Sequence, residues 1–278
     1  LRRSCMDRDD VLVLGDDSRA FLAVVRSLGR HGLRVHVCPF DHAAPALRSR
    51  HIAAIHRLPP YNLDPEEWVR AVRALFDRHR FALVVPCDDR SILPLHRHRD
   101  SWGDTRIALP NEEAFAAFYD KGATRDLAAR AGVAIAPGEV LAPGAEAGAL
   151  VRRYGLPLAL KPRRSFLLDR IGARRSVAIL RAEPDLREAL AGLDRPEDYL
   201  IEGFFAGDGV GVSVLADRGE LLQVFQHHRV AEAGQTGGST YRVSATPDAK
   251  LVEATRALAA AAALHGVAMF EYRQDHAT

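Results

Sequence analysis

Three apolar runs separated by helical stretches most constrain how the first 110 residues can fold. VLVLG (11–15), GLRVHVC (32–38) and FALVVPCDD (81–89) have the composition of buried strands. Apolar residues at helical spacing follow the first run, and a capped helix is expected to begin at Asp64. Because strands that alternate with helices pair in parallel through right-handed crossovers, we predict a doubly wound parallel sheet for residues 1–110.

The pattern changes after about residue 110. Residues 111–137 predict two short helices followed by a turn, and strands dominate from 157 to 231. A last helix is expected from about Asp248 to His265, before a final strand at 267–272. The predicted fold class is therefore α/β, with a Rossmann-like parallel-sheet domain followed by an α+β domain.

Composition narrows the function classes. The chain has 278 residues, of which 47% are hydrophobic, and this composition predicts a soluble globular protein. Its net charge of +2 is close to balance, so no nucleic-acid partner is expected. It contains no apolar run of about 18 residues, so no membrane span is expected. Three cysteines far apart in the sequence argue for a reducing, cytoplasmic location.

Two local features are weak candidates for sites. HRHR (96–99) and HHR (227–229) lack convincing metal-ligand spacing, so solvated basic surface is the favoured interpretation. The turn after the first strand has Gly15 alone of the G-x-G-x-x-G fingerprint, and Asp16 and Asp17 would repel a pyrophosphate. A nicotinamide-dependent oxidoreductase is therefore disfavoured.

Four stretches in order carry a resemblance to a known family. They are YDKGATRDLAARAGVAIAP, YGLPLALKP, YLIEGFFAGDGVGVSVLAD, and the set HHRV, TGGST and LHGVAMFEYRQD. Together they resemble the ATP-grasp superfamily, in particular its carbamoyl-phosphate-synthase-like ATP-binding domain, which occurs in carboxylate–amine ligases. The resemblance implies a pre-ATP-grasp domain at 1–110 and an ATP-grasp domain at 111–278. The latter would comprise entry helices (111–155), a small ATP-clamping lobe (156–206) and a partial C-terminal lobe (207–278).

The resemblance implies an ATP site held by two lysines and a hinge. Lys121 and Lys161 would contact the phosphates as point charges; alternatively, Lys121 caps a surface helix and Lys161 extends from its strand to solvent. Backbone groups of the hinge, residues 202–205, would bind adenine, although Glu202 could instead point to solvent. The ATP-binding residues implied are Lys121, Lys161, Glu202, Gly203, Phe204, Phe205 and Asp208.

A magnesium ligand and a catalytic arginine are also implied. Glu271 ends a strand where the family places a carboxylate that binds Mg²⁺, an ion that prefers oxygen ligands. Arg229, with the loop Thr236–Gly238, resembles the segment that faces the γ-phosphate or the acceptor. We therefore expect ATP and Mg²⁺ as ligands.

The sequence departs from the family in three places. Gly209 stands where related ligases carry a ribose-binding carboxylate, with Asp208 beside it. The loop at 163–176, which would cover the phosphates, has five arginines and a single glycine; those arginines could contact anions or keep the loop soluble. The sequence also ends before the family's Glu-x-Asn strand. It is thus either a fragment, which we favour, or a degenerate member that binds Mg-ATP poorly and turns over slowly if at all.

Two functions follow from these observations. The first is an ATP-dependent ligase that joins a small carboxylate to an amine or similar nucleophile through an acyl phosphate. The second is a catalytically incomplete ATP-binding module, a pseudoenzyme or sensor. Dimers are common among similar proteins, so a homodimer is also implied; the sequence identifies neither substrate.

Overall fold

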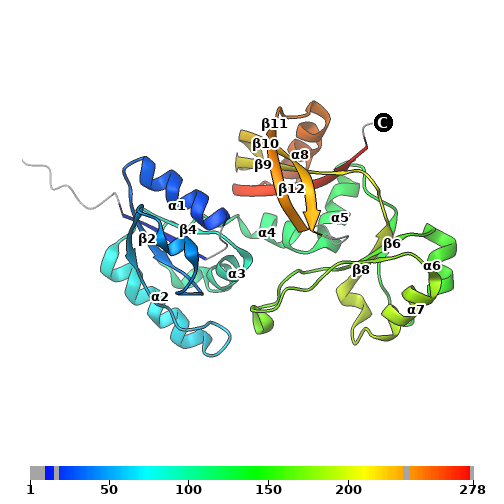
Figure 1. Cartoon of the computed structure of the whole chain (residues 1–278), viewed down its shortest axis with the longest axis horizontal. Coiled ribbons are helices and arrows are strands. Elements are labelled where there is room, and N and C mark those ends of the chain that lie inside the picture. The colour runs from blue at the N-terminus through cyan, green and yellow to red at the C-terminus, as the bar shows by residue number, and fades with distance from the viewer. Residues whose placement is uncertain (1–9, 16–18, 234–237, 276–278) are drawn as a thin grey trace, which may run out of the picture. The chain divides into compact units, whose positions relative to one another are not determined.

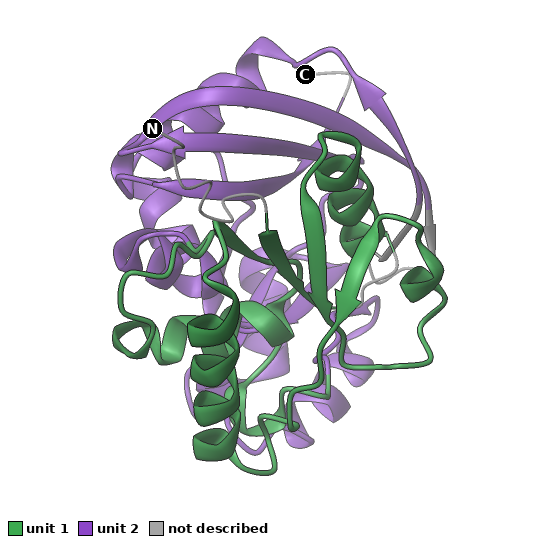
Figure 2. Cartoon of the chain, turned by 90° about the vertical axis from the view of Figure 1, so that its left-hand side faces the viewer, with its two compact units in different colours: residues 1–109, 166–173 green, residues 110–165, 174–278 purple. Residues whose placement is uncertain are grey.

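The computed structural model describes residues 10–15, 19–233 and 238–275. The chain forms two compact units, which are coloured separately in Figure 2. The first unit extends to Leu109 and also includes Phe166–Ala173, whereas the second comprises Pro110–Ser165 and the chain from Arg174 onward.

The first unit contains a four-stranded parallel sheet with the strand order β3-β2-β1-β4. Figure 1 labels two of its strands, β2 and β4. Its edge strand β3 was not predicted, because IAAI is short and alternates between half-buried and exposed side chains. The strands are β1 (Asp10–Leu14), β2 (Arg34–Cys38), β3 (Ile52–Ile55) and β4 (Leu83–Pro86); the helices are α1 (Ala20–Arg30), α2 (Pro65–His79) and α3 (Asp89–Arg97).

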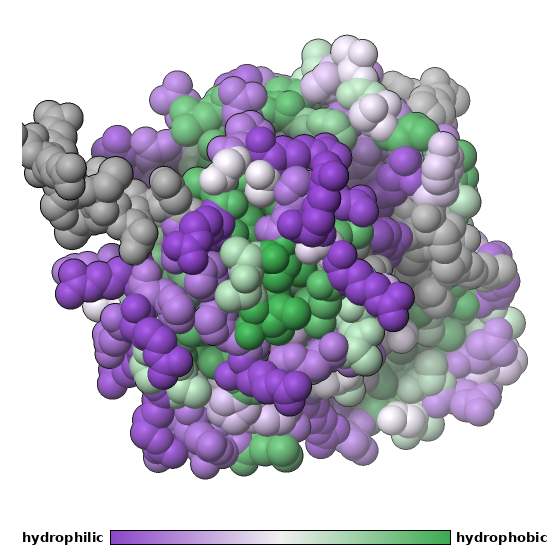
Figure 3. Space-filling view, turned by 60° about the vertical axis from the view of Figure 1, so that its left-hand side comes forward, coloured by the Kyte–Doolittle hydropathy of each residue, from purple (hydrophilic) through white to green (hydrophobic). Residues whose placement is uncertain are grey.

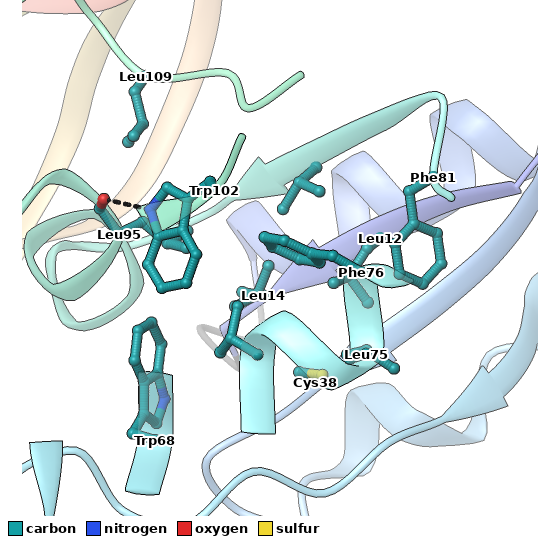
Figure 4. Packing of buried hydrophobic residues seen from close by; sticks show 12 residues of the cluster. Leu12, Leu14, Cys38, Trp68, Leu75, Phe76, Phe81, Leu95, Trp102 and Leu109 are labelled. Carbon is teal, nitrogen blue, oxygen red and sulfur yellow. Dashed lines mark hydrogen bonds between the residues drawn. The ribbon is translucent and has the colours of Figure 1, made fainter. Parts of the chain in front are cut away.

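Both faces of this sheet are covered, which explains the unbroken apolar runs in its strands. Val11 and Val13 of β1 belong to a core that includes Phe21 of α1. Leu12 and Leu14 belong to a second core with the apolar face of α2 (Figure 4). In that second core the indole Nε1 of Trp102 donates a hydrogen bond of 2.8 Å to the carbonyl of Leu95, shown dashed in Figure 4, so its buried polar atom is satisfied.

Two aspartates begin helices in this unit. Asp64 caps α2 by accepting a 2.9 Å hydrogen bond from the amide of Glu67, as its position before a proline predicts. Asp88 caps α3 and forms a reciprocal capping box with Ser91. The acidic turn after the third predicted strand therefore has a structural role at the start of a helix.

The second unit contains two antiparallel sheets. The smaller has the order β5-β8-β6-β7, and one of its faces packs against two helices that the sequence pattern does not predict. Its strands are β5 (Gly138–Val140), β6 (Leu158–Pro162), β7 (Ala178–Leu180) and β8 (Tyr199–Gly203), and the two helices are α6 (Ala147–Tyr154) and α7 (Glu183–Ala191).

The larger sheet has the order β11-β10-β9-β12. A tight turn at Arg218 and Gly219, both with positive φ, joins β9 to β10. One face of the sheet shares a core with three helices. The strands are β9 (Asp208–Asp217), β10 (Glu220–Ala233), β11 (Gly238–Ala245) and β12 (Gly266–Gln274); the helices are α4 (Glu112–Tyr119), α5 (Lys121–Arg130) and α8 (Ala249–Ala261).

The predicted fold class is confirmed: a parallel-sheet unit is followed by a unit of antiparallel sheets and helices. The face in Figure 3 is largely hydrophilic, with a hydrophobic area near its centre. None of the helices among the described residues is long and apolar enough to cross a membrane.

Candidate functional site

Lys161 and Glu202 form an ion pair on the face of the smaller sheet that lies opposite α6 and α7. Leu158 and Leu160 of β6 point into the core under α6 and α7, so strand alternation turns Lys161 to the opposite face. Glu202 of β8 is set opposite Ala159 in the register and so shares that face. Its side chain is only 15% exposed, which rules out the alternative in which Glu202 points to solvent.

Helix α5 adds a second cation to this face. The Nη1 atom of Arg125 lies 3.8 Å from Oε2 of Glu202, and both side chains are mostly buried. Further along the helix, Leu127 and Ala128 pack into the core of the larger sheet. A single helix therefore contacts both sheets of the second unit and fixes the position of Arg125 beside the Lys161–Glu202 pair.

The start of α5 is anchored to the loop that follows β6. Asp120 caps the helix through the amides of Gly122 and Ala123, and it also pairs with Arg163 at 2.9 Å and with Arg164 at 3.2 Å. Two of the five loop arginines are thus engaged by an aspartate. This pairing differs from both roles expected of them, anion contact and loop solubility.

The ionisation of Asp120 reflects these contacts. Burial acts to raise the pKa of Asp120, but the hydrogen bond from Arg163, the amides of Ala123 and Gly122 and the charge of Arg163 outweigh it, and the net pKa is lowered. The carboxylate is therefore charged at neutral pH and holds the helix start and the loop together.

Lys121 lies at the same junction. Its Nζ atom donates to the carbonyl of Pro162 at 3.0 Å and to Oγ of Ser165 at 3.1 Å. Lys121 therefore lies at the end of the strand that carries Lys161. The alternative, in which Lys121 only caps a surface helix, does not account for these contacts.

The hinge after β8 already uses some of its backbone donors. The amide of Gly203 donates to the carbonyl of Pro137 at 2.8 Å, and that of Phe204 donates to Pro157 at 3.0 Å. Within the described part of the chain, the Phe205 amide makes no hydrogen bond. Gly207 lies where the chain passes close to β12. A Cβ at this position would be only 2.5 Å from the carbonyl oxygen of Gln274.

Arg229 and Glu271 form an ion pair on the face of the larger sheet opposite its core. They come from β10 and β12, which flank β9. Gly211 of β9 is opposite Glu271 and Gly209 is two residues before it. Because neither glycine has a side chain, the guanidinium can cross β9 to reach the carboxylate. Arg229 is 8% exposed, whereas Glu271 is 51% exposed and retains access to solvent.

His227 corrects one expectation from the sequence. Its side chain is 5% exposed and lies opposite Gly211, so it is not part of a solvated basic surface. Burial, followed by the charges of Arg242 and Arg229, lowers its pKa, and the ring is neutral at neutral pH. Its Nε2 atom has no hydrogen-bond partner among the described residues.

The other basic stretch also has structural contacts. His98 in HRHR hydrogen-bonds the hydroxyl of Tyr61 at 3.0 Å and packs against Trp102. Solvated surface was therefore the wrong interpretation for this residue as well.

The sequence-predicted residues thus fall into two groups. Lys161 pairs with Glu202 on the smaller sheet, and Lys121 of α5 contacts the end of the strand that carries Lys161. Arg229 pairs with Glu271 on the larger sheet. Asp208 is exposed at the start of β9. Thr236 and Gly237 lie outside the described residues.

Sequence reasoning missed Arg125 and His227, although each had a usable signal. Arg125 is one helical turn after Lys121 and so shares its face of α5. His227 is two residues before Arg229 in a strand, which places both side chains on one face.

Comparison with known proteins supports the fold. No family model and no curated protein matches the chain. Among solved structures it is similar to L-amino acid ligase from Bacillus licheniformis (TM-score 0.69, 16% identity), covering 97% of this chain and 64% of that one. A biotin carboxylase complex from Campylobacter jejuni gives a TM-score of 0.69 at 17% identity, covering 97% and 63% of the two chains.

A third similar structure is N5-carboxyaminoimidazole ribonucleotide synthetase from Thermus thermophilus, with a TM-score of 0.66 and 20% identity. The match covers 96% of this chain and 68% of that one. The chain spans less than two thirds of the length of the L-amino acid ligase and the biotin carboxylase. At these identities the comparison establishes the fold, and the predicted ATP-grasp resemblance is confirmed at that level.

Proposed function

We propose that this chain is the ATP-binding part of an ATP-dependent carboxylate–amine ligase. The observation that carries the proposal is the position of its lysines. Only three of its 38 lysine and arginine residues are lysines. One of these, Lys161, lies in β6, and a second, Lys121, donates to the carbonyl of Pro162 at the end of the same strand. A compact ammonium that can approach phosphate oxygens as a point charge suits that position.

The adenine end of the site fits the hinge. An adenine edge needs a backbone donor and an acceptor, and the unengaged amide of Phe205 supplies the donor. Phe205 is 45% exposed, and its ring offers an apolar surface for the base. Asp208, exposed three residues later, is the candidate ribose contact.

In the proposed site, one protein carboxylate is available to bind Mg²⁺. The half-exposed Glu271 carboxylate would hold the ion, which would neutralise charge on the phosphates. Arg229, paired with that carboxylate, would stabilise charge that develops on the transferred phosphoryl group.

The reaction proposed has two steps. The substrate carboxylate attacks the γ-phosphorus of ATP, giving an acyl phosphate and ADP, and an amine then displaces phosphate to form the amide. The residues of this chain position the phosphates and neutralise their charge, so no protein nucleophile is needed. We assign the first 110 residues to a pre-ATP-grasp domain, the remainder to the ATP-grasp domain, and the activity to the cytoplasm, with a homodimer as the assembly.

A second candidate is an ATP-binding module without catalysis. The observation that favours it is that two carboxylates of the proposed site already pair with basic side chains of the same chain. Glu202 pairs with Lys161, and Glu271 pairs with Arg229. A carboxylate neutralised by an arginine is a weaker magnesium ligand, and such a module would bind nucleotide with little dependence on Mg²⁺.

Calorimetric titration with a non-hydrolysable ATP analogue, with and without Mg²⁺, tests the proposal. We expect Lys161→Ala to abolish measurable binding and Lys250→Ala, which changes the remaining lysine, to leave it intact. Binding that Mg²⁺ strengthens supports the ligase, whereas binding indifferent to Mg²⁺ supports the module. If the unsubstituted chain binds no analogue, both candidates are wrong.

A further inference from the structure

Three histidines that are distant in sequence meet in the first unit. They are His36 of β2, His56 directly after β3, and His79, the last residue of α2. One ring nitrogen of each lies within 4.8 Å of the others. The ring centroids are separated by 4.9–5.1 Å, so all three imidazoles share one small volume.

Two of these nitrogens already converge. Nδ1 of His36 and Nε2 of His56 are 2.8 Å apart. Two nitrogens bound to one tetrahedral zinc ion at about 2.0–2.1 Å would be separated by about 3.3 Å. The observed spacing therefore needs only a small outward shift of these two rings, together with an inward movement of His79, to accept an ion.

A buried carboxylate supports His36 from behind. Oδ2 of Asp10 lies 3.3 Å from Nε2 of His36, the nitrogen that faces away from His56. Asp10 and His36 are 5% and 3% exposed, respectively. A carboxylate beside the outer nitrogen favours the tautomer whose inner nitrogen carries a lone pair, as in metal sites where a carboxylate orients a histidine ligand.

The surroundings also favour neutral, ligating rings. Burial, followed by the neighbouring His36, His79 and Arg78, lowers the pKa of His56 to about 4. Burial is also the main cause of the lowered pKa of His36. Arg34 pairs with the other carboxylate oxygen of Asp10 at 3.2 Å, and the carbonyl end of α2, where His79 lies, would favour a bound cation.

We propose that His36, His56 and His79 bind one divalent transition-metal ion of the zinc class, with water as the fourth ligand. The ion would join β2, the segment after β3 and the end of α2, and so stabilise the first unit. Three imidazole ligands suit zinc, cobalt or nickel and disfavour magnesium or calcium. All three histidines lie in the first unit, whereas the residues of the proposed nucleotide site all lie in the second.

The test uses the full chain, freed of metal, in a competition titration of Zn²⁺ against a chromophoric chelator. We expect one ion per chain, and loss of that ion in His56→Gln and His79→Gln. His42→Gln removes an exposed histidine outside the cluster and should leave binding unchanged. Asp10→Asn, which removes a supporting group, should weaken binding by about 10- to 100-fold.

Two further measurements show whether a variant that loses zinc has lost a metal ligand or has failed to fold. Co²⁺ in place of Zn²⁺ should give the visible absorption of a tetrahedral complex in the unsubstituted chain and in His42→Gln, but not in His79→Gln. Zn²⁺ should raise the melting temperature of the unsubstituted chain and of His42→Gln, but not that of His79→Gln. Circular dichroism without metal checks that each variant folds. Equal zinc binding by all variants, or none by the unsubstituted chain, would overturn the proposal.

Discussion

The imidazole of His227 occupies the space over Gly211 in which a side chain would lie. A Cβ built on Gly211 would be 2.2 Å from Cε1 of His227 and 2.6 Å from its Nε2. The ring is buried, so it cannot move away freely. Gly211 therefore permits both the burial of His227 and the passage of Arg229 across β9 to Glu271.

Substitution of Gly211 by alanine should displace His227. We expect Gly211→Ala to lower the free energy of unfolding by about 1–3 kcal/mol, the usual cost of an added methyl group in a packed site. Urea denaturation measures this loss. Gly192→Ala is the matched control, because a Cβ there makes only ordinary contacts and φ is −83°. Equal stability of the two variants would contradict the close packing of His227.

Asp120 joins the start of α5 to the loop after β6, and we call these contacts the Asp120 clamp. The clamp predicts that the stability of the chain depends on pH. The lowered pKa of Asp120 means that this residue contributes stability above its unfolded pKa, about 3.9, and that this contribution is lost as the pH falls through the folded value. Asp120→Asn should therefore cost about 1–3 kcal/mol of unfolding free energy at pH 7. The difference from the unsubstituted chain should shrink below about pH 4.

Denaturation at a series of pH values checks this prediction. Asp126→Asn changes an exposed aspartate on the same helix and should behave like the unsubstituted chain throughout. A deficit in Asp120→Asn that stays constant down to about pH 2 would show that the charge of the carboxylate is not what stabilises the clamp.

The amide of Phe205, which has no hydrogen-bond partner among the described residues, allows adenine recognition to be tested apart from phosphate binding. Proline at this position removes the N–H group, so Phe205→Pro should weaken binding of an ATP analogue while binding of inorganic tripolyphosphate is retained. Phe205→Ala keeps the amide and isolates the contribution of the ring. If Phe205→Pro binds both ligands normally, the donor for adenine lies elsewhere.

Glu271 is the single carboxylate assigned to the metal. Glu271→Gln keeps the size of the side chain but removes its charge, so the Mg²⁺-dependent part of ATP-analogue affinity should disappear while the Mg²⁺-free affinity stays within about threefold, because that affinity depends on the lysines. Titration calorimetry at two Mg²⁺ concentrations measures both quantities. Glu253→Gln, on the exposed surface of α8, serves as the control. Unchanged Mg²⁺ dependence in Glu271→Gln would remove this residue from the metal site.

Local chemistry explains what was predicted correctly. The alternation of apolar runs and helices predicted the parallel sheet, and Asp64 predicted the start of α2. The edge strand β3 and the helices α6 and α7 were missed because they are short and only partly apolar. Such segments acquire their structure by packing against elements elsewhere in the chain.

The sequence by itself determined the order of the elements and the residue types available for the proposed ATP site, because periodicity, caps and motif order are local properties. Only the tertiary structure decided the partners of these residues. Arg229 and Glu271 are 42 positions apart, and His36 lies 43 positions from His79. Strand register and helix packing bring such pairs together, and local periodicity does not encode either one.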